Sequence, residues 1–261
     1  MKALVKLGGT LLDELDLRRQ VCRGIAGAVR AGHTLVAVHG GGRQMTRFLS
    51  QMGVESRFVD GLRVTTDETL DAVLKVFAGS VNKLLVSSLI ETGVAAVGLS
   101  GIDGPLVEAE LLKAELGHVG KPVRSNPALL NCLLAAGFVP VVACVAGSRD
   151  GRIFNVNADQ MAVACAVGFR PDLLLFLTDV EGVLDADGKR IPQLDREGMQ
   201  KLISTGVAKG GMLAKLRAAQ EALEAGIPQV LIAPGKEPDV IGRALAGEPL
   251  GTRLSGGPAG A

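Results

Sequence analysis

The chain has 261 residues, of which 48% are hydrophobic and 21% are charged, and its 28 Lys and Arg nearly balance its 27 Asp and Glu. This composition excludes a disordered or collagen-like chain and indicates one compact body with a buried core. The net charge of +1 and the absence of Trp and Tyr argue against a nucleic-acid partner or an anionic membrane surface. We therefore expect small-molecule ligands that are held by local charges.

Short apolar runs alternate with helical patterns along the chain, which is typical of an α/β protein. Strands that are apolar throughout suit a sheet buried on both faces, and right-handed crossovers make such a sheet mostly parallel. We predict a three-layer α/β/α sandwich with a mainly parallel central sheet. The expected strands are Ala3–Leu7, Leu35–Val38, Ala95–Leu99, Val139–Val145, Leu173–Leu177 and Val230–Ala233, and the expected helices include Leu15–Arg30, Thr66–Ile90, Ala158–Val167 and Met212–Ala225.

Two segments break this alternation and are predicted to form β-hairpins. They are Val107–Arg124 and Val183–Leu194, and the second contains an Asp187-Gly188 turn signal. Hairpins beyond the carboxyl ends of parallel strands commonly flank the ligand crevice of an open α/β sheet. We therefore expect the chemistry at that edge of the sheet.

The segment Ala128–Gly147 is apolar enough to be tested as a membrane span. Pro140 divides it, however, so we predict a buried helix that ends at Gly137 and then the strand Val139–Val145. The N-terminus enters a strand at once and lacks a signal-peptide pattern, which makes the cytoplasm the expected location. The four cysteines lie far apart without a C-x-x-C pair, so we expect reduced core thiols at Cys22, Cys132, Cys144 and Cys165.

A lysine stands near the end of the first expected strand, in Lys6-Leu7-Gly8-Gly9-Thr10. Inside a sheet buried on both faces an ammonium group is costly unless it meets an anion, so Lys6 indicates a ligand charge or a buried carboxylate. The alternative is a lysine on an exposed edge strand whose ammonium reaches solvent. The residues alone leave both interpretations open.

The second expected strand runs into His39-Gly40-Gly41-Gly42-Arg43. Three successive glycines free the backbone amides at a strand-to-helix turn, which suits a phosphate or a developing oxyanion. The alternative is a merely tight turn, for which one or two glycines usually suffice. We favour the anion site because it lies where α/β sheets bind phosphate. The pattern is neither that of a P-loop enzyme nor that of a Rossmann dehydrogenase.

Two further segments carry polar side chains that could reach a substrate. Arg63 precedes the long helix, and its guanidinium could clamp a carboxylate, although a surface pair with a neighbouring aspartate explains it equally well. In Asn155-Val156-Asn157-Ala158-Asp159, the second Asn suits a helix N-cap and Asp159 suits the first turn. Capping leaves Asn155 unexplained.

Polar groups also follow the last strands. Thr178-Asp179-Val180-Glu181-Gly182-Val183 resembles a strand-end nucleotide site, with an ordinary loop as the alternative. Lys209-Gly210-Gly211 then opens a helix that carries Lys215 about one turn in, and this combination forms a second anion site. Two basic sites and one aspartate fit phosphoryl transfer, in which catalysis depends on positioning and cations more than on a covalent nucleophile.

In this order, the motifs resemble those of the amino acid kinase family, and within it the branch that acts on N-acetyl-L-glutamate. The resemblance spans nearly the whole chain. It rests on Lys6-Leu7-Gly8-Gly9, His39-Gly40-Gly41-Gly42, Gly61-Leu62-Arg63-Val64-Thr65, Gly117-His118-Val119-Gly120, Asn155-Val156-Asn157-Ala158-Asp159, Thr178-Asp179-Val180-Glu181-Gly182-Val183, Gly211-Met212 with Lys215, and Gly251-Thr252-Arg253.

The resemblance implies transfer of the γ-phosphoryl group of ATP, bound with Mg²⁺, to the side-chain carboxylate of N-acetyl-L-glutamate in arginine biosynthesis. By the same resemblance, Lys6 and Lys215 stabilise the transition state and Asp159 orients both lysines. The amides of Gly8, Gly41 and Gly42 hold the transferring group, and Gly41, Gly42, Arg63 and Asn155 bind the acceptor. The nucleotide residues are Thr178, Asp179, Val180, Glu181, Gly182, Val183, Lys209 and Gly211, and no protein side chain is expected to bind the metal.

The family pattern further implies two lobes that share one sheet, with acetylglutamate binding and dimerisation in residues 1–170 and ATP binding in residues 171–261. Only five residues precede Lys6, whereas arginine-sensitive members carry an extra helix there, so we expect an arginine-insensitive homodimer with Thr66–Ile90 as its candidate interface. Two alternatives stay open. One is a kinase of carrier-protein-linked aminoadipate in lysine biosynthesis, and the other is a nucleotide-binding regulator without catalysis.

Overall fold

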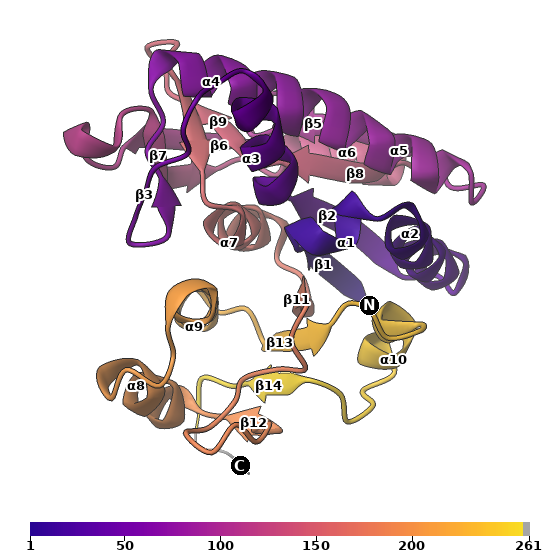
Figure 1. The fold of residues 1–261 in the computed structure, drawn as a ribbon. Helices are drawn as coiled ribbons and strands as arrows, with labels where there is room; N and C mark the ends of the chain where they lie inside the picture. The colour runs from indigo at the N-terminus through magenta and orange to yellow at the C-terminus, as the bar shows by residue number, and fades with distance from the viewer. Residues whose placement is uncertain (258–261) are drawn as a thin grey trace.

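The computed structural model describes residues 1–257, and an eight-stranded sheet in the order β12-β14-β13-β11-β1-β2-β8-β5 runs through it (Figure 1). Neighbouring strands are parallel except β13 and β14, which are antiparallel. The prediction of a mainly parallel sheet is confirmed. The strands are β1 (Lys2–Leu7), β2 (Thr34–His39), β5 (Ala96–Ser100), β8 (Val139–Ala143), β11 (Leu173–Thr178), β12 (Gln193–Leu194), β13 (Gln229–Pro234) and β14 (Thr252–Leu254).

Helices cover both faces of this sheet, which confirms the predicted three layers. In Figure 1, α2 and α10 lie on one side of the strands, and α7 and α9 lie on the other. Helix α2 contacts both α5 and α10, whereas α9 contacts α7 and α8. The bounds are α2 (Leu15–Arg30), α5 (Asn82–Ile90) and α10 (Val240–Leu245) for the first layer, and α6 (Ala128–Ala135), α7 (Ala158–Phe169), α8 (Arg196–Ser204) and α9 (Gly210–Glu224) for the second.

The central strands are apolar from end to end because helices cover them on both sides. Every residue of β11, with the sequence LLLFLT, is buried. Strand β1 lies between β11 and β2 in the middle of the sheet, so Lys6 does not stand on an edge strand. This position rules out the interpretation of Lys6 as a lysine that reaches solvent from an exposed edge.

A second, smaller sheet carries the first predicted hairpin. Strands β6 (Val107–Leu111) and β7 (Val119–Ser125) pair antiparallel, which confirms that hairpin, and β9 (Val145–Gly147) and β10 (Ile153–Val156) complete a closed four-stranded barrel. The second predicted hairpin is reduced to a single bridge between Leu184 and Arg190, because β12 leaves it to pair with β14 in the main sheet.

Helix α6 differs from the predicted buried helix. It ends at Ala135 rather than Gly137, and only Leu130 within it is buried, because α6 packs on β8 and leaves its outer side uncovered. Cys132 is consequently exposed, and the expectation of a core thiol is wrong at this position. Burial raises the thiol pKa to about 12 at the three buried cysteines, Cys22, Cys144 and Cys165.

The predicted helix Thr66–Ile90 is continuous but changes its winding. It consists of α4 (Asp67–Val73), a π-helical segment η1 (Leu74–Val81) and α5. The Thr66 hydroxyl caps it by accepting a hydrogen bond from the Thr69 amide at 3.2 Å. By length and composition, Asp67–Ile90 is the one helix among residues 1–257 that could cross a bilayer, and 44% of its most apolar stretch is buried inside the molecule, where α5 contacts β5 and β8.

Candidate active site

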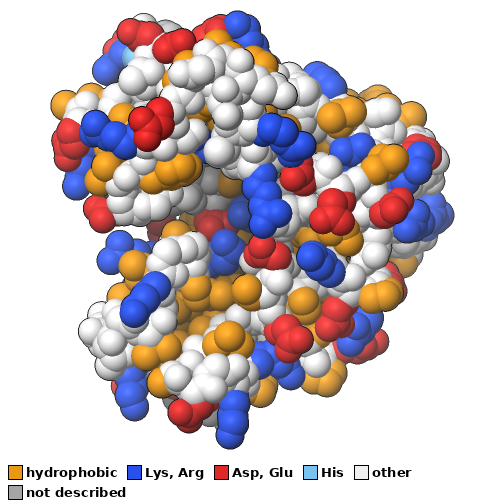
Figure 2. All heavy atoms as spheres, viewed as in Figure 1, with side chains coloured by type: hydrophobic (Ala, Val, Ile, Leu, Met, Phe, Trp, Pro, Cys, Tyr) orange, Lys and Arg blue, Asp and Glu red, His pale blue; other side chains and the backbone are white. Residues whose placement is uncertain are grey.

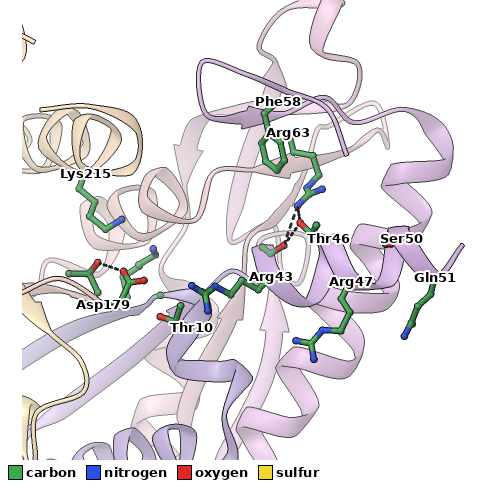
Figure 3. A pocket seen from close by; sticks show the side chains of 14 residues that line it. Thr10, Arg43, Thr46, Arg47, Ser50, Gln51, Phe58, Arg63, Asp179 and Lys215 are labelled. Atoms are coloured by element: carbon green, nitrogen blue, oxygen red, sulfur yellow. Dashed lines mark hydrogen bonds between the residues drawn. The ribbon is translucent and has the colours of Figure 1, made fainter. Parts of the chain in front are cut away.

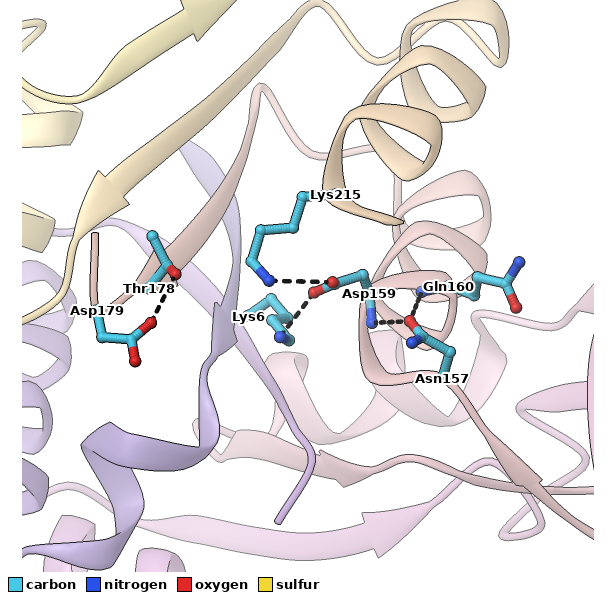
Figure 4. A network of polar contacts seen from close by, with 7 residues as sticks. All are labelled: Lys6, Asn157, Asp159, Gln160, Thr178, Asp179 and Lys215. Atoms are coloured by element: carbon cyan, nitrogen blue, oxygen red, sulfur yellow. Dashed lines mark hydrogen bonds and ion pairs between the residues drawn. The ribbon is translucent and has the colours of Figure 1, made fainter. Parts of the chain in front are cut away.

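Three charged side chains from distant parts of the chain meet near the carboxyl end of β1. Lys6 Nζ lies 2.6 Å from Asp159 Oδ1, and Lys215 Nζ lies 3.3 Å from Asp159 Oδ2 (Figure 4). Lys6 comes from β1, Asp159 from the first turn of α7, and Lys215 from α9. The structure thus brings together the two lysines and the aspartate that the sequence analysis singled out.

Lys6 and Asp159 are buried, Lys215 is half-buried, and the three side chains together carry a net positive charge. Burial opposes the ionisation of Asp159, but the attraction of Lys6 and Lys215 outweighs it and holds the pKa of this carboxyl below its ordinary value. Burial lowers the pKa of Lys215, against the opposing attraction of Asp159. A single carboxylate between two ammonium groups leaves one positive charge without a partner. Because an unpaired buried charge is costly, the trio favours an anionic ligand.

The helix start holds Asp159 in place. Asn157 Oδ1 accepts hydrogen bonds from the amides of Asp159 at 2.9 Å and of Gln160 at 3.3 Å, which confirms the predicted N-cap (Figure 4). The positive end of the α7 dipole favours a carboxylate in its first turn. The cap therefore fixes the carboxylate between the two lysines.

Lys6 and Lys215 line a cavity of about 770 Å³ (Figure 3). In the space-filling view, the molecule is hollowed between the region of β3 (Phe58–Val59) and that of α8 and α9, and charged side chains surround the hollow (Figure 2). A cavity of this size suits a nucleotide and a small acceptor. The predicted residues in its wall are Lys6, Gly8, Gly42, Arg63, Thr178, Asp179 and Lys215, and the others are Thr10, Arg43, Thr46, Arg47, Ser50, Gln51 and Phe58.

The glycine turn joins β2 to helix α3 (Gly42–Gln51). A Cβ atom on Gly41 would lie 2.9 Å from the ring of Phe77, and one on Gly40 would lie 3.1 Å from the Cβ of Ala158, so the packing leaves no room for side chains. Gly42 lines the cavity, and the first amides of a helix have no acceptor within it. These amides are available to an anion in the cavity.

The buried side chain of His39 holds this turn in place through hydrogen bonds. Its Nε2 atom lies 3.0 Å from Asn82 Nδ2, which can only donate, so Nε2 accepts, and Nδ1 donates to the Gly40 carbonyl at 2.8 Å. Burial lowers the His39 pKa to about 4, so the ring is neutral at physiological pH. His39 therefore positions the turn and does not supply a positive charge.

Gly8 lies in the cavity wall, but its amide is already engaged. The Gly8 N–H donates to the carbonyl of Leu177 at 3.1 Å, whereas we expected this amide to hold the transferring group. A Cβ atom on Gly8 would lie 3.0 Å from the same carbonyl oxygen. Close contact between β1 and β11 therefore accounts for glycine at this position.

Arg63 is a buried cation on a small hairpin formed by β3 (Phe58–Val59) and β4 (Leu62–Arg63). Its guanidinium donates to Ser56 Oγ at 2.5 Å, to Thr46 Oγ1 at 2.8 Å and to the Gly42 carbonyl at 3.2 Å, and it stacks on the Phe58 ring. Within residues 1–257, no carboxylate forms an ion pair with it, so the alternative of a surface pair is not observed. Burial lowers its pKa.

A smaller cavity of about 140 Å³ adjoins the large one and shares Gly42, Phe58 and Arg63 with it. Asn155 lines this small cavity from β10, and its Nδ2 donates to Thr65 Oγ1 at 3.0 Å. The predicted acceptor residues Gly41, Gly42, Arg63 and Asn155 therefore share one cavity wall.

The predicted nucleotide residues are only partly brought together. Thr178 and Asp179 line the large cavity at the end of β11, on the same wall as Lys215. Val183 is buried, and its amide donates to Thr252 Oγ1 at 2.8 Å. The residues that line neither cavity are Val180, Glu181, Gly182, Val183, Lys209 and Gly211.

The sequence analysis missed two arginines in the wall of the large cavity, Arg43 and Arg47. Arg43 belongs to the quoted glycine motif, but only the glycines entered the argument. The signal that could have found both residues is their spacing of four, which places them on one face of the helix that follows the glycines. Within residues 1–257, no cluster of three or more His, Cys, Asp or Glu side chains could hold a metal ion.

Cations held beside exposed amides, at the carboxyl edge of a parallel sheet, are what a phosphotransferase requires, because its transition state spreads negative charge over several oxygens. The chain belongs to the amino acid kinase family, since the sequence model of that family matches residues 1–233.

Individual relatives agree with this assignment. The chain is 59% identical over 254 residues to the acetylglutamate kinase of Solibacter usitatus (strain Ellin6076), covering 97% of this chain and 99% of that one. It is 45% identical over 243 residues to the acetylglutamate kinase of Acidobacterium capsulatum, covering 92% and 94%. The crystal structure of smu.665 from Streptococcus mutans UA159 superposes with a TM-score of 0.85 at 28% identity, covering 98% of this chain and 99% of that one.

Proposed function

We propose that this protein transfers the γ-phosphoryl group of ATP to the side-chain carboxylate of N-acetyl-L-glutamate, giving N-acetyl-L-glutamyl 5-phosphate in L-arginine biosynthesis. The observation that carries the proposal is the Lys6–Asp159–Lys215 trio beside a cavity that adjoins the Arg63 and Asn155 wall. The similarity to two acetylglutamate kinases over almost the whole chain supports the choice of acceptor.

The transfer is an in-line displacement. A carboxylate oxygen of the acceptor forms a bond to the γ-phosphorus, the bond from that phosphorus to the β,γ-bridging oxygen breaks, and ADP leaves with the electron pair. The acceptor needs no general base, because a carboxyl group of pKa about 4.3 is ionised at neutral pH. Lys6 and Lys215 compensate the charge on the transferring oxygens, and Asp159 fixes the separation of the two ammonium groups.

Arg63 and Asn155 select the acceptor. The guanidinium is a planar double donor that suits the backbone carboxylate of acetylglutamate, and its neighbours Ser56 and Thr46 are neutral and leave its charge uncompensated. Asn155 provides an amide group for the uncharged part of the acceptor. The amides of Gly41 and Gly42 face the reacting carboxylate and phosphoryl group.

Thr178 and Asp179 mark the nucleotide end of the cavity. Mg²⁺ keeps several waters and uses one or two carboxylates together with substrate phosphates, so a cavity with the carboxylate of Asp179 in its wall fits an ion that arrives with ATP. When bound, the ion neutralises phosphate charge. Roles in nucleotide binding for Val180, Glu181, Gly182, Val183, Lys209 and Gly211 stay predictions from the sequence, as do the cytoplasmic location and the homodimer.

The test is capture of the acyl phosphate as a hydroxamate with hydroxylamine. We expect product from MgATP and N-acetyl-L-glutamate, and far less from glutamate or aspartate. If carrier-linked aminoadipate gave more product than N-acetyl-L-glutamate, it would be the acceptor instead. ATP binding without product from any acceptor would favour a nucleotide-binding regulator.

A further inference from the structure

Two arginines in the wall of the large cavity, Arg43 and Arg47, have no role in the reaction described above. Arg43 is the second residue of α3 and lines the same wall as Gly42. In Figure 3 its side chain extends along the cavity toward Thr10, on the side where Asp179 and Lys215 lie. Its guanidinium therefore points toward the region in which the phosphoryl group moves.

Arg43 differs from the other arginines of this wall in having no partner. Arg47, one turn further along α3, pairs with Asp13, and Arg63 donates to three oxygens. Among residues 1–257, the Arg43 guanidinium has neither an ion pair nor a hydrogen bond. An arginine side chain that extends into a cavity without an acceptor is ready for a ligand oxygen.

Arg43 is exposed, and most charged side chains in the wall that it shares are cations, with the carboxylate of Asp179 as the exception. The N-terminus of α3 carries the positive end of a helix dipole, which disfavours positive side chains in the first turn. Lys6 and Lys215 share a single carboxylate and leave a further positive charge in the same cavity. An anion bound among these groups would turn the repulsion into attraction.

We propose that Arg43 contacts the transferring phosphoryl group as a third cation, from α3, while the two lysines approach from β1 and α9. The inference rests on the proposed phosphoryl transfer. Three equatorial oxygens carry the charge of the transition state, and a guanidinium can donate to two acceptors at once. Arg43 is thus a catalytic residue of this chain.

Steady-state kinetics of Arg43→Gln, Arg43→Lys and Arg23→Gln test this role. Removing one preorganised donor to transition-state charge typically lowers kcat by about 10²–10³-fold, so with two lysines left we expect a fall of at least ~10-fold for Arg43→Gln. The KM for acetylglutamate should change little. Arg43→Lys should recover part of the rate, and the matched control Arg23→Gln should stay within about threefold because Arg23 is exposed on α2 and lines neither cavity.

Calorimetry separates failure of this inference from failure of the proposed function. Arg43→Gln should weaken binding of MgADP with aluminium fluoride, which occupies the place of the phosphoryl group, by at least ~10-fold and leave binding of MgADP alone nearly unchanged. Equal binding of the fluoride complex by both proteins, or an unchanged kcat, would overturn the role of Arg43. If the wild-type protein gave no hydroxamate with any acceptor, the proposed function would fail and the calorimetric comparison would still decide the contact.

Discussion

At the scale of single residues, Asp159 determines both the stability and the activity of the site. The variant Asp159→Asn leaves the buried ammonium group of Lys6 and the half-buried one of Lys215 without a carboxylate, and such a loss typically costs about 3–5 kcal/mol in the free energy of unfolding. We also expect kcat to fall, because the lysines lose their common anchor. Urea unfolding at pH 7 measures the first effect. Asp179→Asn is the control, since Asp179 forms no ion pair within residues 1–257, and an equal loss in both variants would contradict the argument.

The pH dependence of stability follows from the same residue. The pKa of Asp159 is lower in the folded protein than in the unfolded chain, so its contribution is complete above the ordinary carboxyl pKa of about 3.9 and is lost as the pH falls through the lower folded value. The difference in unfolding free energy between the wild type and Asp159→Asn should therefore stay constant from pH 7 to about 5 and narrow only below about pH 4. A difference that already narrowed between pH 7 and pH 6 would contradict this assignment.

The deprotonation of Lys215 should set the pH above which catalytic activity falls. Burial lowers its pKa below the ordinary lysine value, so the ammonium group loses its proton, and with it the attraction for phosphate, at a lower pH than an exposed lysine would. As the pH is raised, we expect kcat/KM for ATP to begin to fall before the pH reaches about 10.4, the ordinary lysine pKa. In Lys215→Arg the residual activity should decline at a higher pH, because a guanidinium keeps its charge. If Lys215→Arg lost activity over the same alkaline pH range as the wild type, the decline would belong to another ionisable group.

Much of the site could be predicted at this scale, because buried charges and glycine runs are visible in the sequence. Lys6 interrupts an apolar strand, and Asp159 follows a recognisable N-cap. The commitment of the Gly8 amide to Leu177 could not be predicted, since it depends on how two strands distant in the chain pair. Phe58 also escaped prediction, because its stacking on Arg63 depends on the bend of a two-residue hairpin.

At the scale of elements, the glycine turn gives a sharp test of packing. A Cβ atom at Gly41 meets the Phe77 ring at 2.9 Å and Val81 at 3.2 Å, whereas one at Gly42 has nothing within 4 Å. We expect Gly41→Ala to lower the free energy of unfolding by about 1–3 kcal/mol, and Gly42→Ala to leave it nearly unchanged. Paired urea titrations measure both values. Equal stability of the two variants would show that the η1 segment shifts to make room for the Cβ atom without loss of unfolding free energy.

Element boundaries were predictable where the periodic pattern is clear. Helix α2 begins and ends at the expected residues because its apolar face repeats regularly and polar residues cover the opposite face. Helix α6 is apolar nearly all round, so its sequence could not reveal that one side is uncovered. The π-helical winding of η1 was not predictable either, because it arises within an otherwise ordinary helical pattern.

At the scale of the whole molecule, the homodimer is a prediction from the sequence. We expect light scattering after size-exclusion chromatography to give twice the 26.9 kDa mass of the chain, with and without arginine. Exposed Leu84 and Ile90 on the long helix offer apolar area for such a contact. A sixfold mass together with inhibition by arginine would contradict the prediction.

The three-layer class could be predicted because all strands of the core are apolar, but the order of the strands could not. Strand β1 pairs with β11, about 170 positions further along the chain, and local pattern carries no information on such partners. The division at residue 170 is likewise a prediction from the sequence.

The central place of β1 has a consequence for synthesis on the ribosome. Its partner β2 emerges early, but its other side gains a partner only when Leu173–Leu177 has been made. Until then the edge of β1 has unpaired backbone donors and acceptors, and these can pair with strands of other chains. We therefore expect a protein cut off after residue 170 to keep this unpaired strand edge and to aggregate more readily than the full chain.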